Sequence, residues 1–215
     1  MGLLKALVCA LALGGSGLAL AESEFALYSG VQGSPHSTVT NFNGTKDFFS
    51  WQGQSLKMPI YAGWRYTEWL DDQWGVALNF THVKDYANLP DAVNVKYDTL
   101  EFTDGANPIT VIALRRFEPT ASGLKPYVGV GAGITMPHVE ELRIGSPQTD
   151  KTFGYQYGGP AVTALAGFKY PINDKWDFMT EFQVHYMMFD VRVAGGRLKT
   201  NLISNAINIG AVYRF

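Results

Sequence analysis

The C-terminal stretch TNLISNAINIGAVYRF, residues 200–215, decides the fold. Its large apolar side chains recur at every second position and end at Phe215, whereas Ser204, Asn208 and Arg214 belong to the opposite face. A period of two indicates a β-strand with one apolar and one polar face. The stretch therefore predicts the closing strand of a membrane-spanning β-barrel, in which one face meets lipid and the other lines the lumen.

The same alternation recurs along the chain and predicts eight strands. They cover residues 25–32, 57–69, 74–83, 107–117, 125–136, 159–170, 176–187 and 200–215. Most have about the 9 to 11 residues that a strand needs to cross a bilayer. The predicted fold class is all-β: an eight-stranded antiparallel transmembrane β-barrel.

The connections between these strands alternate in length. Residues 70–73, 118–124 and 171–175 are short connections, whereas residues 33–56, 84–106, 137–158 and 188–199 are long ones. Outer-membrane barrels have short periplasmic turns and long extracellular loops. We therefore assign the long connections to extracellular loops.

The polar face of the predicted strands carries charged side chains, namely Arg65, Lys169, Glu181 and Arg214. A charge costs a few kcal/mol on the lipid face but is tolerated in a lumen. We expect these side chains to form a network that fills the narrow interior. Aromatic residues near the short turns, Trp69 and Tyr127 among them, predict a girdle at the membrane interface.

The N-terminal residues 1–21 have the layout of a secretory signal peptide: Lys5, an apolar run, and Ala19-Leu20-Ala21 before the cleavage point. Residues 22–215 would then form the mature barrel, in the outer membrane of a Gram-negative bacterium. The 17 basic and 19 acidic residues give a net charge of -2, with no long basic run. Nucleic acid is therefore excluded as a partner.

The four histidines fall near strand ends that share one side. His36, His82, His138 and His185 all lie at the extracellular end of the predicted barrel, if the amino terminus is periplasmic. Alternation places His36 and His185 inward, and His82 and His138 on the lipid-facing side.

Carboxylates accompany these imidazoles in the long connections. Glu101 and Asp104 belong to the second connection, and Glu140 follows His138 closely. The candidate catalytic residues are His36, His138, His185, Glu101 and Asp104. A divalent transition metal would be held by His36, His82, His138 and Glu140. The alternative is that the acids are ordinary solvated loop residues.

Five segments of the chain resemble the lipid A oxidase family of small outer-membrane barrels. They are residues 33–37 (GSPHS), 98–105 (DTLEFTDG), 137–140 (PHVE), 170–174 (YPIND) and 205–210 (NAINIG). The resemblance spans essentially the whole mature chain. It implies oxidation of the proximal glucosamine of lipid A to 2-aminogluconate, with molecular oxygen as co-substrate. It carries over no set of catalytic residues.

Two other functions remain open. One is a non-enzymatic structural or surface-interaction barrel. The other is a lipid A deacylase, which would need a histidine and a serine two positions apart on one strand face, whereas His36 and Ser37 are adjacent. In each case the expected partners are lipid A, other outer-membrane lipid and the barrel assembly machinery, and we expect a monomer.

Overall fold

The computed structural model describes residues 22–89, 96–102 and 104–215, in which thirteen strands join one sheet. The strands are β1 (Ser23–Thr40), β2 (Lys46–Gln52), β3 (Ala62–Trp69), β4 (Trp74–His82), β5 (Asp85–Ala87), β6 (Tyr97–Phe102), β7 (Pro108–Arg116), β8 (Lys125–Thr135), β9 (His138–Arg143), β10 (Thr152–Tyr155), β11 (Gly159–Pro171), β12 (Trp176–Val193) and β13 (Gly196–Arg214). A 3-10 turn, η2 (Gln148–Asp150), precedes β10.

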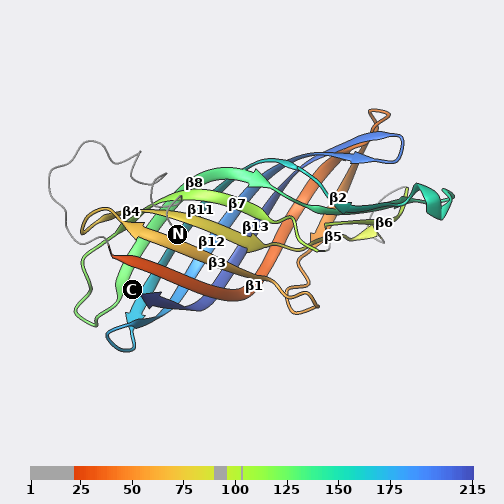
Figure 1. The fold of residues 1–215 in the computed structure, drawn as a ribbon. Coiled ribbons are helices and arrows are strands. Elements are labelled where there is room, and N and C mark those ends of the chain that lie inside the picture. Colours follow the sequence, from red (N-terminus) through yellow and green to blue (C-terminus); the bar gives the residue numbers. More distant parts are fainter. Residues whose placement is uncertain (1–21, 90–95, 103) are drawn as a thin grey trace.

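Eight of these strands form a closed antiparallel barrel, as the sequence predicted. Their order is β3, β4, β7, β8, β11, β12, β13 and β1, and β1 also pairs with β3, which closes the ring. The strands tilt across one another, and the C-terminus lies at one end of the barrel (Figure 1). The predicted signal peptide, residues 1–21, lies outside the described residues.

The two faces of the wall have the expected chemistry. In β13, Ile207 and Ile209 are 65% and 57% exposed on the outside, whereas Asn208 between them is fully buried in the lumen. Within the described residues, no helix has the length and hydropathy required to cross a membrane.

The prediction of a long loop at residues 188–199 is wrong. β12 continues to Val193 and β13 begins at Gly196, so the connection is a tight turn at Ala194 and Gly195. The strands continue because Phe189, Val191 and Leu198 still alternate inward, toward a second core. In contrast, β3 begins at Ala62, so residues 57–61, predicted as strand, lie outside it.

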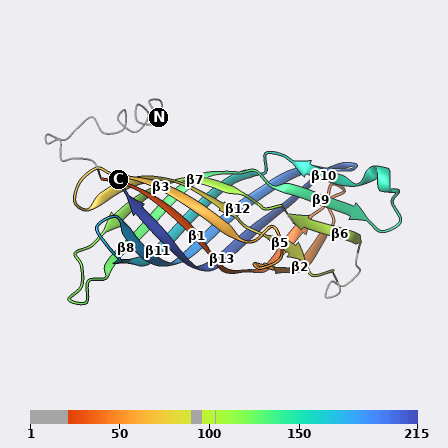
Figure 2. The ribbon, with the colours of Figure 1, turned by 60° about the horizontal axis from the view of Figure 1, so that its bottom comes forward.

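Strands β2, β5, β6, β9 and β10 arise within the other three predicted loops. Together with the ends of β1, β12 and β13 they extend the wall beyond the barrel, at the end opposite the C-terminus (Figure 2). We name this part the extension. The free edge of the extension, at β10, is linked to β12 by hydrogen bonds from side chains. The Gln156 side chain donates one to the Arg192 backbone oxygen and accepts one from the Arg192 backbone N–H. The Thr152 hydroxyl accepts one from the Ala194 backbone N–H.

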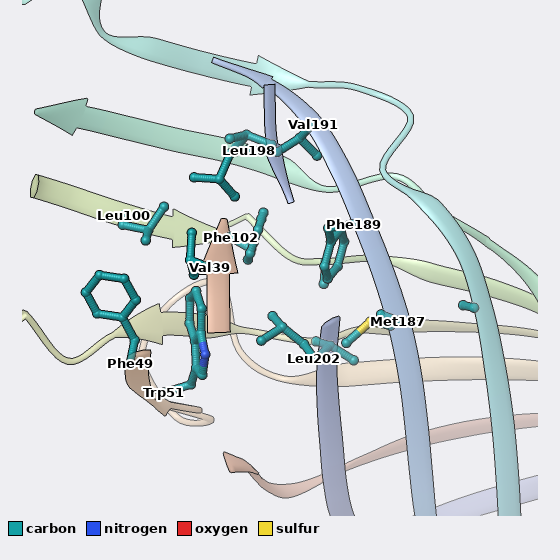
Figure 3. Close-up of a cluster of buried hydrophobic side chains, with 14 of the residues drawn as sticks. Val39, Phe49, Trp51, Leu100, Phe102, Met187, Phe189, Val191, Leu198 and Leu202 are labelled. Carbon is teal, nitrogen blue, oxygen red and sulfur yellow. The ribbon is translucent and has the colours of Figure 1, made fainter. Parts of the chain in front are cut away.

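Buried apolar side chains fill the extension. The ring of Phe102 stacks on Phe189, with centroids 4.6 Å apart, and on Trp51, with centroids 5.9 Å apart. Figure 3 shows these rings and their aliphatic neighbours pointing toward one another from several strands. The extension is thus a packed structure with its own core.

Charged side chains fill the half of the lumen near the C-terminus. Arg65 binds Glu181 through two hydrogen bonds of 2.6 and 2.8 Å, and the Tyr127 hydroxyl donates to the same carboxylate. The other lumen pairs are Lys169 with Glu24, Arg214 with Asp177 at 3.1 Å, and Lys125 with Asp177 at 3.6 Å. All four side chains of the predicted network lie in the lumen, but only Arg65 and Glu181 pair with each other, whereas Lys169 and Arg214 take Glu24 and Asp177 as partners.

Two aromatic residues of the predicted girdle lie in this network instead. Trp69 and Tyr127 are each only 2% exposed. The ammonium of Lys169 lies 5.2 Å from the Trp69 ring centroid and 5.4 Å from that of Tyr127. The cation attracts both ring faces, which accounts for their inward position.

Asp85, at the start of β5, is a buried carboxylate inside the extension. Ser34 donates a hydrogen bond to its Oδ1, and its Oδ2 has no partner within the described part of the chain. Burial raises the pKa of Asp85 to about 7, and the Ser34 hydrogen bond only partly offsets this. The Asp85 carboxyl group therefore favours the folded state when it is protonated and neutral.

We expect the stability of the extension to fall as pH rises from about 4 to about 7, because the unfolded chain loses the Asp85 proton first. The change is a few kcal/mol, at about 1.4 kcal/mol per unit of pKa difference. Asp85→Asn should remove this dependence and raise the unfolding temperature at about pH 8. Thermal unfolding followed by tryptophan fluorescence checks this, with exposed Asp98→Asn as the control. Equal pH profiles for wild type and Asp85→Asn would contradict it.

Candidate functional site

A row of side chains crosses four strands on the outer surface of the extension. Tyr86 of β5 pairs with Glu101 of β6, Glu101 with Glu140 of β9, and Glu140 with Phe153 of β10. Directly paired residues in antiparallel strands point to the same face. Their neighbours Leu100 and Val139 point inward to the core, which leaves this row on the outside.

His138 and Asp104 extend this row toward the barrel. The His138 imidazole lies against the rings of Phe153 and Tyr155, at centroid distances of 4.5 and 4.8 Å. Its Nδ1 is 3.9 Å from the Asp104 carboxylate, and the Tyr155 hydroxyl donates to the Asp104 backbone oxygen. We name Tyr86, Glu101, Asp104, His138, Glu140, Phe153 and Tyr155 the outer-face patch.

A tight turn holds Asp104 in place. The side-chain Nδ2 of Asn107 donates hydrogen bonds to the backbone oxygens of Asp104, Gly105 and Met136. Its Oδ1 lies 3.0 Å from the His82 Nδ1. Gly105 has φ +92°, and a Cβ there would lie 2.2 Å from the Asn107 Oδ1. The turn thus requires glycine, and it brings His82 beside the patch.

Burial and charge both act on the carboxylates of the patch. The pKa of Glu101 is raised, first by burial and then by the negative charge of Glu140. Lys57 and Lys151 oppose this rise, and Lys151 forms an ion pair of 2.6 Å with Glu140. Glu101 is therefore a stronger base than an ordinary carboxylate and the member of the patch best suited to accept a proton.

The patch lies directly beyond the lipid-facing wall. Only Met136 and Pro137 separate β8 from His138, and Ile134 is 41% exposed on the outer face of β8. His82 likewise ends β4, three residues before β5 begins. A lipid seated against β4 and β8 would thus have its headgroup at the level of the patch.

The predicted site residues separate into three places. Glu101, Asp104, His138 and Glu140 share the patch, with His82 beside it, and both histidines face outward as expected. His185 faces inward as expected but lies in the middle of β12, bonded to Thr163. The prediction placed it at the rim because the long continuation of β12 was not recognised.

His36 is exposed on the outer face, not inward. Its ring stacks on Phe48 of β2 at a centroid distance of 5.2 Å. The register of β1 shifts between Gly33 and Val39, which reverses the alternation on which the prediction rested. Ser37 points inward and accepts a hydrogen bond from the Trp51 indole. His36 and Ser37 thus lie on opposite faces and form no nucleophile and base pair.

The proposed metal ligands do not form one cluster. Across residues 22–89, 96–102 and 104–215, no group of three or more His, Cys, Asp or Glu side chains could hold a metal ion. His36 lies apart from the patch, and Asp104 acts on both His82 and His138. The described side chains therefore do not fit a metal centre, and we derive no reaction step through one.

Five residues at or beside the patch are not among those that the sequence singled out: Lys57, Tyr86, Lys151, Phe153 and Tyr155. The sequence places Lys57 in a spanning strand and the other four in long loops without expected structure. The alternation of polar and apolar residues within 97–102 and 138–143 is a signal that could have placed strands there.

A closed barrel with an apolar outer wall, a charged lumen and a packed extension defines an outer-membrane β-barrel protein. The chain belongs to the family described as outer membrane protein beta-barrel domain, whose model matches residues 7–215. Because both termini of such barrels are periplasmic, the extension is extracellular.

Two solved structures share the fold. Neisserial surface protein A (NspA) is 17% identical, with 93% of this chain and 100% of that chain covered and a TM-score of 0.51. OprG from Pseudomonas aeruginosa is also 17% identical, with 91% and 94% covered and a TM-score of 0.50. No curated protein matches the chain. At this identity the likeness shows the fold alone.

Proposed function

We propose that the protein acts on lipid A from the outer leaflet and oxidises its proximal glucosamine to 2-aminogluconate. The observation that carries the proposal is the outer-face patch, which groups carboxylates, an imidazole and exposed aromatic rings at headgroup level, outside the lumen. A substrate that diffuses laterally in the leaflet can reach the carboxylates and the exposed rings without leaving the membrane, whereas the His138 imidazole, 4% exposed, lies against the rings of Phe153 and Tyr155. The reaction itself is taken from the resemblance to lipid A oxidases.

The chemistry requires a proton acceptor beside the sugar ring. Glu101 takes the anomeric hydroxyl proton, because its raised pKa makes it a stronger base than an ordinary carboxylate. The C1–H bond breaks, its hydrogen and both its electrons pass to molecular oxygen, and the proton held by Glu101 completes hydrogen peroxide, which leaves. Water then opens the resulting lactone to the acid. Phe153 and Tyr155, 66% and 62% exposed, supply flat surfaces for packing against the sugar.

We expect Glu101→Gln to abolish the oxidised product, because the neutral amide cannot accept the proton. Mass spectrometry of lipid A from cells that express wild-type or variant protein measures the product. The matched control is Glu118→Gln, in an exposed turn at the periplasmic end. The gel mobility shift on heating shows whether each variant folds.

The outcome for the wild type separates the candidate functions. A gain of one oxygen atom in lipid A supports the oxidase, and loss of an acyl chain would instead indicate a deacylase. Unchanged lipid A would favour a non-enzymatic surface barrel. Among non-enzymatic functions, the packed lumen and extension favour a surface barrel over a pore. Full activity in Glu101→Gln would remove Glu101 from the mechanism.

A further inference from the structure

Two lysine ammonium groups meet at the Tyr86 ring, at one end of the outer-face patch. The Nζ of Lys57 lies 4.7 Å from the ring centroid, and that of Lys84 lies 5.5 Å from it. Lys57 is exposed on the segment between β2 and β3, whereas Lys84 is fully buried and donates to the Lys57 backbone oxygen. Two separate segments of the chain therefore bring positive charge to one place.

Neither ammonium has an acidic partner in the described part of the chain. No Asp or Glu oxygen there lies within 4.0 Å of Lys57 or Lys84, although other lysines of the extension are paired, such as Lys151 with Glu140 at 2.6 Å. Asp104 acts on Lys84, and Glu101 interacts with Lys57, only through longer-range electrostatic attraction. Burying a cation without a counter-ion is costly, so the position of Lys84 calls for a reason.

The residues on either side of Lys57 indicate its depth in the membrane. Leu56 and Met58 are 81% and 77% exposed, and Ile60, before β3, is 42% exposed. Large apolar side chains that flank an exposed lysine are typical of a segment at a membrane interface, where the apolar groups enter lipid and the ammonium reaches the phosphates.

We propose that the exposed ammonium of Lys57 binds a phosphate monoester on the sugar headgroup of an outer-leaflet glycolipid, with the buried charge of Lys84 adding to the attraction. The inference rests on the proposed function, and it fixes how the substrate lies on the patch. The phosphate lies at the lysine end beside β5, where it contacts the Lys57 ammonium, and the buried Lys84 adds positive potential without touching it. The sugar extends over Glu101 and Glu140, whose carboxylate oxygens accept hydrogen bonds from its hydroxyl groups, toward the exposed ring of Phe153.

The test compares two lipids on the full folded barrel. The wild type and its variants, in detergent, are titrated with purified lipid A that carries a phosphate on its distal sugar and has a free anomeric hydroxyl, as the oxidation requires, and with the same lipid A after enzymatic dephosphorylation. We expect the wild type to prefer the phosphorylated form, and Lys57→Ala to reduce that affinity about tenfold without changing the affinity for the other lipid. Lys57→Arg should retain most of the preference, and Lys84→Met should weaken it.

The control is Lys46→Ala, an exposed lysine at the far end of β2, which should bind both lipids as the wild type does. Equal affinity of the wild type for the two lipids overturns the proposal, as does an unchanged preference in Lys57→Ala. Competition by inorganic phosphate at concentrations comparable to the lipid would identify free phosphate as the ligand, and would overturn the assignment to a lipid.

The same variants are assayed for oxidised lipid A, so that the two proposals fail separately. Phosphate-dependent binding that is lost in Lys57→Ala, with no oxidation by the wild type, keeps the phosphate site and removes the oxidase. Oxidation by the wild type together with an unchanged binding preference in Lys57→Ala keeps the oxidase and removes the phosphate site.

Discussion

Replacing Glu181 with alanine is expected to lower the free energy of unfolding of the barrel by about 3 to 5 kcal/mol. The Glu181 carboxylate accepts both hydrogen bonds of the buried Arg65 guanidinium and one from the Tyr127 hydroxyl. Both charged side chains are almost completely buried, at 4% and 0% exposure. Without the carboxylate, Arg65 keeps its charge in a poorly solvated lumen, and Asn79 is the one hydrogen-bond acceptor left to it among the described residues.

Urea unfolding of the refolded protein in detergent micelles measures this effect. The matched control is Asp190→Ala, which removes an ion pair with Arg197 between side chains that are 43% and 48% exposed. Exposed pairs contribute about 1 kcal/mol or less, so the control should be nearly neutral. A double variant, Arg65→Met with Glu181→Leu, should recover much of the loss, because it leaves no unpaired charge. Equal losses in the two single variants would contradict this account of the lumen.

The barrel could be predicted from the sequence because its strands have two chemically different faces. Lipid outside and a polar lumen inside impose a strict alternation, which is visible in the residues of β12 and β13. The strands of the extension were not predicted because their two faces differ less in polarity. Its strands β5 and β10 have only three and four residues, too few to show a period.

The candidate site was predicted in its composition but not in its grouping. Glu101, Asp104, His138 and Glu140 were chosen from two predicted loops, and strand pairing between β6 and β9 brings them to one surface. His36 was assigned to the wrong face because a bulge inserts into β1 after Gly33. A bulge of this kind depends on the partner strands, so local alternation cannot reveal it.

The extension positions the outer-face patch, so weakening its core tests the link between packing and function. Phe102 is fully buried and stacks between Trp51 and Phe189, and it follows Glu101 directly in β6. We expect Phe102→Ala to destabilise the extension by about 3 to 5 kcal/mol, the usual cost of removing a buried ring. The eight-stranded wall has its own hydrogen bonds and charged lumen, so it should remain folded.

Hydrogen exchange followed by mass spectrometry distinguishes the two parts of the molecule. In Phe102→Ala, amides of β5, β6 and β9 should exchange much faster, whereas amides in the first half of β12, against β11, keep their protection. The control is Ile144→Ala, which removes a side chain that is 55% exposed on the extension. Because the Glu101 and Glu140 pairing depends on β6, the lipid A product should fall together with this protection. Faster exchange with unchanged product would mean that the carboxylates act without the geometry of the folded extension, and would contradict a site built on strand pairing.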